Sequence, residues 1–200
     1  MLPIKRIIIA TSNEGKMKEF RRLLAHKNVE ILSMHEAGID IDIDENGTTF
    51  EENAAIKAKA VCDVAHTLCL SDDSGLVIDY LNGEPGIYSA RYLGHDTPYE
   101  EKNRIIIDRL KGVPEEKRTA RFVCAVAAAF PDGRVITVKD TMEGRIAEEP
   151  AGCGGFGYDP IFFFPPKGMT SAELTPDEKN AVSHRGKALR KMVSILEKEL

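Results

Sequence analysis

The segment Thr11-Ser12-Asn13-Glu14-Gly15-Lys16 follows a β-branched apolar run and precedes a stretch with helical spacing. It combines hydroxyl and amide side chains, a lysine that can neutralise negative charge, and a glycine that lets a ligand approach the backbone. A helix N-terminus favours anions because its N–H groups are free and its dipole end is positive. The segment therefore suits phosphate, although it is not a Walker A loop and an ordinary helix cap explains it equally well.

Asp72 and Asp73 stand side by side in Ser71-Asp72-Asp73-Ser74-Gly75, directly after a short apolar run. Adjacent carboxylates repel each other unless a cation or hydrogen bonds compensate their charge. Mg²⁺ prefers one or two carboxylates together with water and substrate phosphates, so this segment could hold it. We interpret the segment as a polar turn after a strand, and a purely solvated acidic turn is the alternative.

A second acidic segment contains Asp40, Asp42, Asp44 and Glu45. The first three carboxylates alternate with isoleucines at 39, 41 and 43, a pattern that predicts an edge strand with its acidic residues on one side. Most of these carboxylates are expected to be solvated. Only a minority could bind a metal ion.

Two later segments could contact an aromatic ligand. Cys153-Gly154-Gly155-Phe156-Gly157-Tyr158-Asp159-Pro160 can place an aromatic face against a base and backbone N–H groups at its edge, although glycine-rich loops also serve tight packing. Ser183-His184-Arg185-Gly186 lies in a predicted C-terminal helical region, with Lys179 about one and a half turns earlier. A helical His-Arg pair is more often an ordinary surface feature.

The elements that must position these segments alternate between strands and helices. The apolar periodicity and capping signals predict helices at 16–26, from Thr48 or Thr49 to about His66, at 98–111, and from Thr175 onward. Strands are predicted at 7–10, 68–70, 76–80, 120–130 and 134–146, with a hairpin turn at 131–133. Because there is no repeat and no linker, residues 1–200 are expected to form a single domain.

Composition limits the class of protein. The net charge of −5 disfavours a nucleic-acid partner, because binding the phosphate backbone needs a surplus of Lys and Arg. With 42% hydrophobic and 30% charged residues the chain is expected to be soluble and not to span a membrane. The four cysteines are interpreted as buried or free thiols, and the apolar run near the N-terminus is too short for a secretory signal, so we expect a cytoplasmic protein.

Six segments in order resemble the inosine triphosphate pyrophosphatase family, also called the Ham1-like proteins. They are Thr11–Lys16, Thr49–Ala54 with Lys57, Asp72–Gly75, Gly83–Arg91, Gly154–Phe162 and Ser183–Gly186. Together they cover nearly the whole chain. The resemblance implies an α/β fold with a long, twisted mixed β-sheet flanked by helices, two lobes with a central active-site cleft, and a homodimer.

The resemblance also implies roles for individual residues. Thr11, Ser12, Asn13, Glu14, Gly15 and Lys16 would hold the triphosphate, with Lys57, Ser74 and Lys179 as further polar contacts. Asp44 and Asp73 would bind Mg²⁺, and Asp73, with Asp72 beside it, would be the catalytic proton acceptor. Phe156 would stack on the purine, while Gly157, Tyr158, Asp159, His184 and Arg185 would read the base edge. Family members usually carry Glu where this chain has Asp44, which leaves Asp44 and Glu45 open as the second metal ligand.

The function implied is hydrolysis of inosine and xanthosine triphosphates, including dITP, to the monophosphate and pyrophosphate. Water would attack the α-phosphorus, with Mg²⁺ and Lys16 countering negative charge. Two alternatives use the same residues: a nucleotidyltransferase with another acceptor, and a nucleotide sensor without catalysis.

Overall fold

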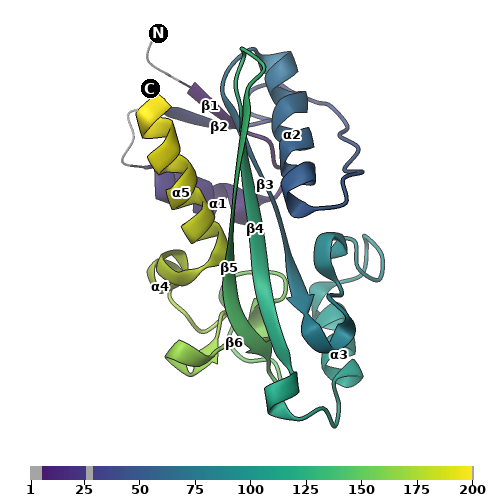
Figure 1. Ribbon diagram of the computed structural model, residues 1–200. Coiled ribbons are helices and arrows are strands. Elements are labelled where there is room, and N and C mark those ends of the chain that lie inside the picture. Colours follow the sequence, from purple (N-terminus) through teal and green to yellow (C-terminus); the bar gives the residue numbers. More distant parts are fainter. Residues whose placement is uncertain (1–5, 26–28, 200) are drawn as a thin grey trace. The chain divides into compact units, whose positions relative to one another are not determined.

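The computed structural model describes residues 6–25 and 29–199 (Figure 1). The helices are α1 (Glu14–Leu24), α2 (Phe50–Ala65), α3 (Tyr99–Arg109), α4 (Pro176–Val182) and α5 (His184–Glu199). The strands are β1 (Arg6–Ile9), β2 (Glu30–Ser33), β3 (Cys69–Ile78), β4 (Thr119–Ala129), β5 (Val135–Ile146), β6 (Phe162–Phe164) and β7 (Met169–Thr170). Two predictions fall partly outside the described residues. The sequence considered as a secretory signal includes residues 1–5, and the first predicted helix was expected to end at His26.

The strands form a seven-stranded sheet in the order β2-β1-β3-β4-β5-β6-β7. The pairs β1–β2 and β1–β3 are parallel, whereas β5–β6 and β6–β7 are antiparallel. This arrangement confirms the prediction of an α/β fold with a mixed sheet and helices. Among the described residues, no helix is long and apolar enough to cross a membrane.

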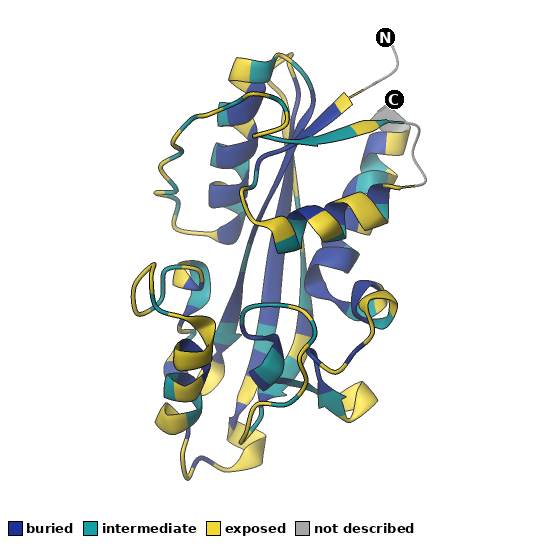
Figure 2. Cartoon of the chain, turned by 180° about the vertical axis from the view of Figure 1, so that it is seen from behind, coloured by how far each residue is buried: buried dark blue, intermediate teal, exposed yellow. Residues whose placement is uncertain are grey.

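The chain divides into two compact units, each with its own core. The first contains residues 1–73, 124–140 and 185–200, and its core joins apolar residues of β1, α1, β3, β4 and α5. The second contains residues 74–123 and 141–184, with a core from β3, α3, β4, β5 and the segment 158–162. Figure 2 shows the helices as buried on one side and exposed on the other, as amphipathic helices on a sheet must be.

Helix caps confirm most of the predicted helix starts. The Thr49 side chain accepts a hydrogen bond from the Glu52 backbone N–H, and the Glu52 carboxylate accepts one from the Thr48 N–H. Thr175 and Glu178 form a complete capping box at the start of α4. The predicted hairpin turn is also present, with Gly133 at a φ of 90° and its N–H bonded to the Phe130 carbonyl.

Two predictions about acidic segments are wrong. Residues 39–43 alternate in exposure as predicted, but they are not part of any strand. Residues 71–75 are not a turn, since β3 runs without interruption from Cys69 to Ile78 and includes both aspartates. The strand can continue through two carboxylates because each one meets compensating groups on its own face, as described below.

The cysteines behave as predicted. All four are free thiols; Cys62, Cys69 and Cys124 are buried and Cys153 is exposed. Burial raises the pKa of the Cys69 thiol to about 12, so it stays protonated at neutral pH.

Candidate active site

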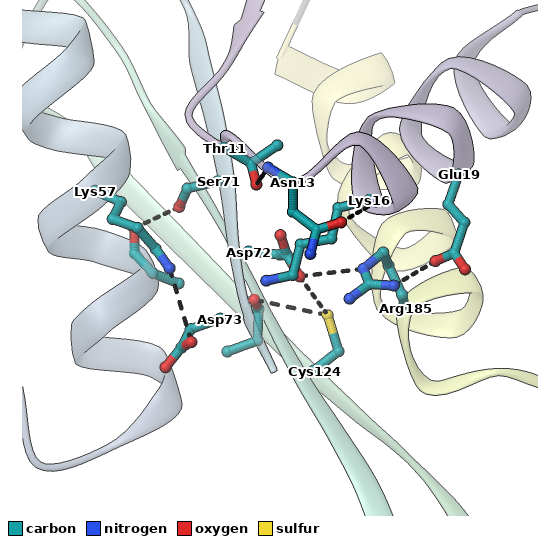
Figure 3. Close-up of polar contacts among 12 residues, drawn as sticks. Thr11, Asn13, Lys16, Glu19, Lys57, Ser71, Asp72, Asp73, Cys124 and Arg185 are labelled. Carbon is teal, nitrogen blue, oxygen red and sulfur yellow. Dashed lines mark hydrogen bonds and ion pairs between the residues drawn. The ribbon is translucent and has the colours of Figure 1, made fainter. Parts of the chain in front are cut away.

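In the first unit, β3 directs its two aspartates to opposite faces of the sheet. Successive side chains of a strand alternate between faces, so neighbouring residues meet different partners. Figure 3 shows Asp72 turned toward α1 and the start of α5, whereas Asp73 is turned toward α2. One strand thereby supplies two carboxylates with separate surroundings.

Asp72 is a fully buried carboxylate between two cations. Its Oδ2 lies 3.0 Å from Lys16 Nζ and 3.1 Å from Arg185 Nε. Arg185 also donates from Nη1 to Glu19, so the guanidinium joins two carboxylates. Burial opposes ionisation of Asp72, but Lys16 and Arg185 outweigh it and hold its pKa well below the usual range. Asp72 is therefore an ionised structural anchor.

The segment before Lys16 is the N-terminus of α1, as predicted. Asn13 caps the helix by accepting a hydrogen bond from the Lys16 N–H at 3.0 Å, and its own N–H donates to Thr11 Oγ1 at 3.2 Å. Ser12, Asn13 and Glu14 are exposed. An anion placed there would meet a helix N-terminus with the Lys16 ammonium nearby.

Asp73 faces α2 and has a different electrostatic environment. Its Oδ2 accepts a hydrogen bond from Asn53 at 3.2 Å, and its Oδ1 lies 3.7 Å from Lys57 Nζ. Burial raises the pKa of Asp73, and Lys57 only partly offsets this effect. A carboxylate with a raised pKa is a better proton acceptor than an ordinary aspartate.

The carboxylates near Asp73 suit a hard divalent cation. Lys57 Nζ lies 2.9 Å from Glu45 Oε2 as well as 3.7 Å from Asp73, so two carboxylates converge on one positive charge. Asp44 is exposed and accepts a 3.3 Å hydrogen bond from Asn46. Within residues 6–25 and 29–199 no group of three His, Cys, Asp or Glu could hold a metal alone. A hard divalent cation needs only one or two protein carboxylates, because water and phosphate oxygens can complete its shell.

In the second unit, Asp159 organises the loop that carries Phe156. The buried carboxylate accepts hydrogen bonds from the Phe156 N–H at 2.8 Å and from Lys179 Nζ at 2.6 Å. Lys179 Nζ also lies 4.9 Å from the centre of the Phe156 ring. A Cβ on Gly155, which has a φ of 70°, would lie 2.1 Å from Asp159 Oδ2, so only glycine fits there.

Tyr158 and His184, which were predicted to contact the base, are fixed by contacts within the second unit. Tyr158 is buried, and its hydroxyl donates to the Ser89 carbonyl at 2.7 Å. His184 is buried with its ring stacked on Phe122, the ring centres 4.8 Å apart. Ser74 is half-buried. The structure thus brings Phe156, Asp159 and Lys179 together in one unit, and Lys16, Asp72 and Arg185 in the other.

Several site residues were not predicted from the sequence. Asn53 bonds Asp73 and stands one helical turn before Lys57, a spacing that could have revealed it. Glu19 neutralises Arg185, and no local pattern connects residues so far apart in the chain. The ion pair between Glu45 and Lys57 was likewise not predicted from the sequence.

Replacing Asp72 with Asn should destabilise the protein by about 3–5 kcal/mol, because it removes the buried carboxylate that pairs with Lys16 and Arg185. The folded-state pKa of Asp72 lies below its unfolded value, so its stabilisation is present above about pH 4 and disappears as the pH falls through the folded-state pKa. Denaturant unfolding of wild type and variant should therefore differ most at neutral pH. The exposed pair of Asp63 with Lys59 provides the control, since Asp63→Asn should change stability by less than ~1 kcal/mol. Equal stability of wild type and Asp72→Asn at pH 7 would contradict the anchor role.

Comparison with known proteins identifies relatives that match nearly the whole chain. The sequence model of the Ham1 family matches residues 7–195. A dITP/XTP pyrophosphatase of Bacillus subtilis (strain 168) is 48% identical over 197 residues, covering 98% of this chain and all (100%) of the relative. One of Geobacillus kaustophilus (strain HTA426) is 48% identical over 189 residues, covering 94% of this chain and 93% of the relative. The solved structure of the Staphylococcus aureus Ham1 protein matches with a TM-score of 0.88 and 38% identity, covering 98% of this chain and 100% of that one. The chain therefore belongs to the Ham1 family.

Proposed function

We propose that this chain hydrolyses the triphosphates of non-standard purines, ITP, dITP and XTP, to the monophosphate and pyrophosphate. The relatives that cover 98% and 94% of the chain are dITP/XTP pyrophosphatases. The observation that carries the proposal is the position of Asp73, a buried carboxylate of raised pKa that shares Lys57 with a second carboxylate, Glu45.

The phosphate end of the substrate is assigned to residues of the first unit. Thr11 to Gly15 present the N-terminus of α1, and Lys16 supplies a positive charge that the buried Asp72 holds in place. Asp73 accepts the proton of the attacking water, and Asn53 and Lys57 orient its carboxylate. When bound, Mg²⁺ would neutralise phosphate charge and lower the pKa of water.

We assign Asp44 as the second Mg²⁺ ligand beside Asp73. Glu45 is already engaged by Lys57, whereas Asp44 is exposed and has only a long hydrogen bond from Asn46. Ser74 adds a hydroxyl to the phosphate contacts.

The base is assigned to residues of the second unit. Phe156 stacks on the purine, with Asp159 and Lys179 fixing its backbone and ring. Lys179, His184 and the N–H groups of the Gly157–Tyr158 segment are donors for a 6-oxo group. Arg185 is bonded to Asp72 and Glu19, so any base contact it makes must leave these bonds intact or exchange one of them.

The proposed partner is a second copy of the chain, in a cytoplasmic homodimer. The second unit exposes several large apolar side chains near one another in sequence: Tyr80, Tyr88, Leu93 and Tyr99. Exposed apolar side chains favour protein contact, and the net charge of −5 disfavours nucleic acid.

One assay distinguishes hydrolysis from its two alternatives. ITP and Mg²⁺ are supplied without an acceptor, and IMP and pyrophosphate are measured. Formation of both supports hydrolysis. Product that forms only with an added acceptor supports a nucleotidyltransferase, and binding without turnover supports a sensor.

Replacing Asp73 with Asn keeps the side-chain shape but removes the proton acceptor, so kcat for ITP should fall at least ~100-fold. Thermal unfolding should change less than in Asp72→Asn, because the Lys57 ammonium lies 3.7 Å from Asp73 and keeps its closer partner Glu45 at 2.9 Å. Steady-state kinetics beside a melting curve measure both quantities. A folded variant with near-normal kcat would remove Asp73 from the mechanism.

Replacing Asp44 with Asn should weaken Mg²⁺ binding at least ~10-fold. Glu45→Gln is the matched control and should change it less, since Glu45 acts through Lys57. Titration of Mn²⁺ by electron paramagnetic resonance reports binding independently of turnover. A larger loss in Glu45→Gln than in Asp44→Asn would make Glu45 the second ligand.

Selectivity should follow the substituent at purine C6. The donors of the proposed base site match the 6-oxo group of ITP and XTP but meet a donor in the 6-amino group of ATP, so kcat/KM for ATP should be at least ~10⁴-fold lower. Lys179→Met should reduce activity with ITP much more than the residual activity with ATP, and Lys179→Gln, which retains a donor, should lose less. Equal losses for both nucleotides in a folded variant would show that Lys179 does not read the base.

A further inference from the structure

Asn103 of α3 contacts the loop assigned to the base but has no part in the roles described so far. Its side chain is buried, with 4% of the residue exposed, and Nδ2 donates to the Gly157 carbonyl at 3.1 Å. Both residues belong to the second unit. A buried side-chain amide that bonds a loop backbone restricts the conformation of that loop.

The bond from Asn103 fixes the orientation of one particular peptide group. The Gly157 carbonyl and the Tyr158 N–H belong to the same planar trans peptide and point in opposite directions. Holding the carbonyl on the α3 side therefore directs the Tyr158 N–H away from α3. Gly157 has a φ of 68°, a conformation that needs such support because glycine itself imposes little restriction.

The Tyr158 N–H is a donor that the segment from Phe156 to Asp159 leaves available. The Phe156 N–H donates to Asp159 Oδ2 at 2.8 Å and the Asp159 N–H to the Phe156 carbonyl at 3.3 Å. In the described part of the chain, no protein group accepts a hydrogen bond from the N–H of Gly157 or Tyr158. A ligand acceptor such as a purine 6-oxo group can satisfy them.

The other contacts of Tyr158 hold its side chain and not this peptide plane. Its hydroxyl donates to the Ser89 carbonyl, and its ring meets the Tyr99 ring edge to face with centres 5.1 Å apart. Rotation of the peptide between Gly157 and Tyr158 would keep both contacts and lose only the Asn103 bond.

We propose that Asn103 is a positioning residue for base selectivity, which orients the Tyr158 N–H toward the 6-oxo group of the substrate. This inference rests on the proposed function, since it concerns the base end of the same nucleotide. Asn103 acts through the loop and contacts neither the phosphates nor the attacking water.

The test compares Asn103→Asp and Asn103→Ala with wild type. In Asn103→Asp the carboxylate has the shape of the amide, but it presents an acceptor where the Gly157 carbonyl needs a donor. Asn103→Ala removes the donor without adding charge. Both should weaken IMP binding, measured by calorimetry, and raise KM for ITP by ~10-fold, with kcat within about twofold of wild type. Residual activity with ATP should not fall, so the ratio of ITP to ATP activity decreases. Inhibition by pyrophosphate should be unchanged.

The control is Lys102→Met on the same helix, because Lys102 Nζ donates to the Ala90 carbonyl at 2.9 Å and not to the loop. It should leave the ITP to ATP ratio unchanged. Melting curves establish that each variant is folded at the assay temperature. Normal IMP affinity and ratio in both Asn103 variants would overturn the proposal, as would equal losses of kcat for ITP and ATP. Failure of wild type to convert ITP would instead refute the proposed function.

Discussion

The structure of the first unit depends on the compensation of one buried charge, the carboxylate of Asp72. An ionised group in a protein interior is costly unless it is paired and hydrogen-bonded. Lys16 from α1 and Arg185 from α5 provide the pairing, and Glu19 balances the second positive charge. The ion pairs thereby tie α1 and α5 to β3, the strand that also carries Asp73.

This compensation explains how adjacent aspartates can differ in function. Because they lie on opposite faces of β3, Asp72 meets two cations whereas Asp73 meets an amide and a more distant lysine. Their pKa values consequently move in opposite directions, down for Asp72 and up for Asp73. One residue is suited to anchoring and the other to accepting a proton. The Lys16 ammonium, held by the anchor, is placed at the helix N-terminus where phosphate is proposed to bind.

Local signals predicted the parts of this arrangement that depend on neighbouring residues. The caps at Asn13, Thr49 and Thr175 follow from short patterns, and so do most of the strands. A turn was predicted at 71–75 because polar residues usually end a strand. The prediction was wrong because the groups that compensate Asp72 come from distant segments, so β3 continues through both aspartates. The same reason hid Glu19 and Asn103, whose partners lie 166 and 54 residues away in the chain. Arg185 was assigned to the base from family resemblance, and only the fold reveals its bonds to Asp72 and Glu19.

The most direct test of this account is the structure of the protein with Mg²⁺ and a non-hydrolysable ITP analogue. Asp73 should contact the ion, Lys16 should contact the phosphates, and Asp72 should keep its bond to Arg185. The 6-oxo group should accept a hydrogen bond from the Tyr158 N–H. A complex in which Asp72 binds the ion and Asp73 remains apart from ion and water would contradict the division of roles between the two aspartates.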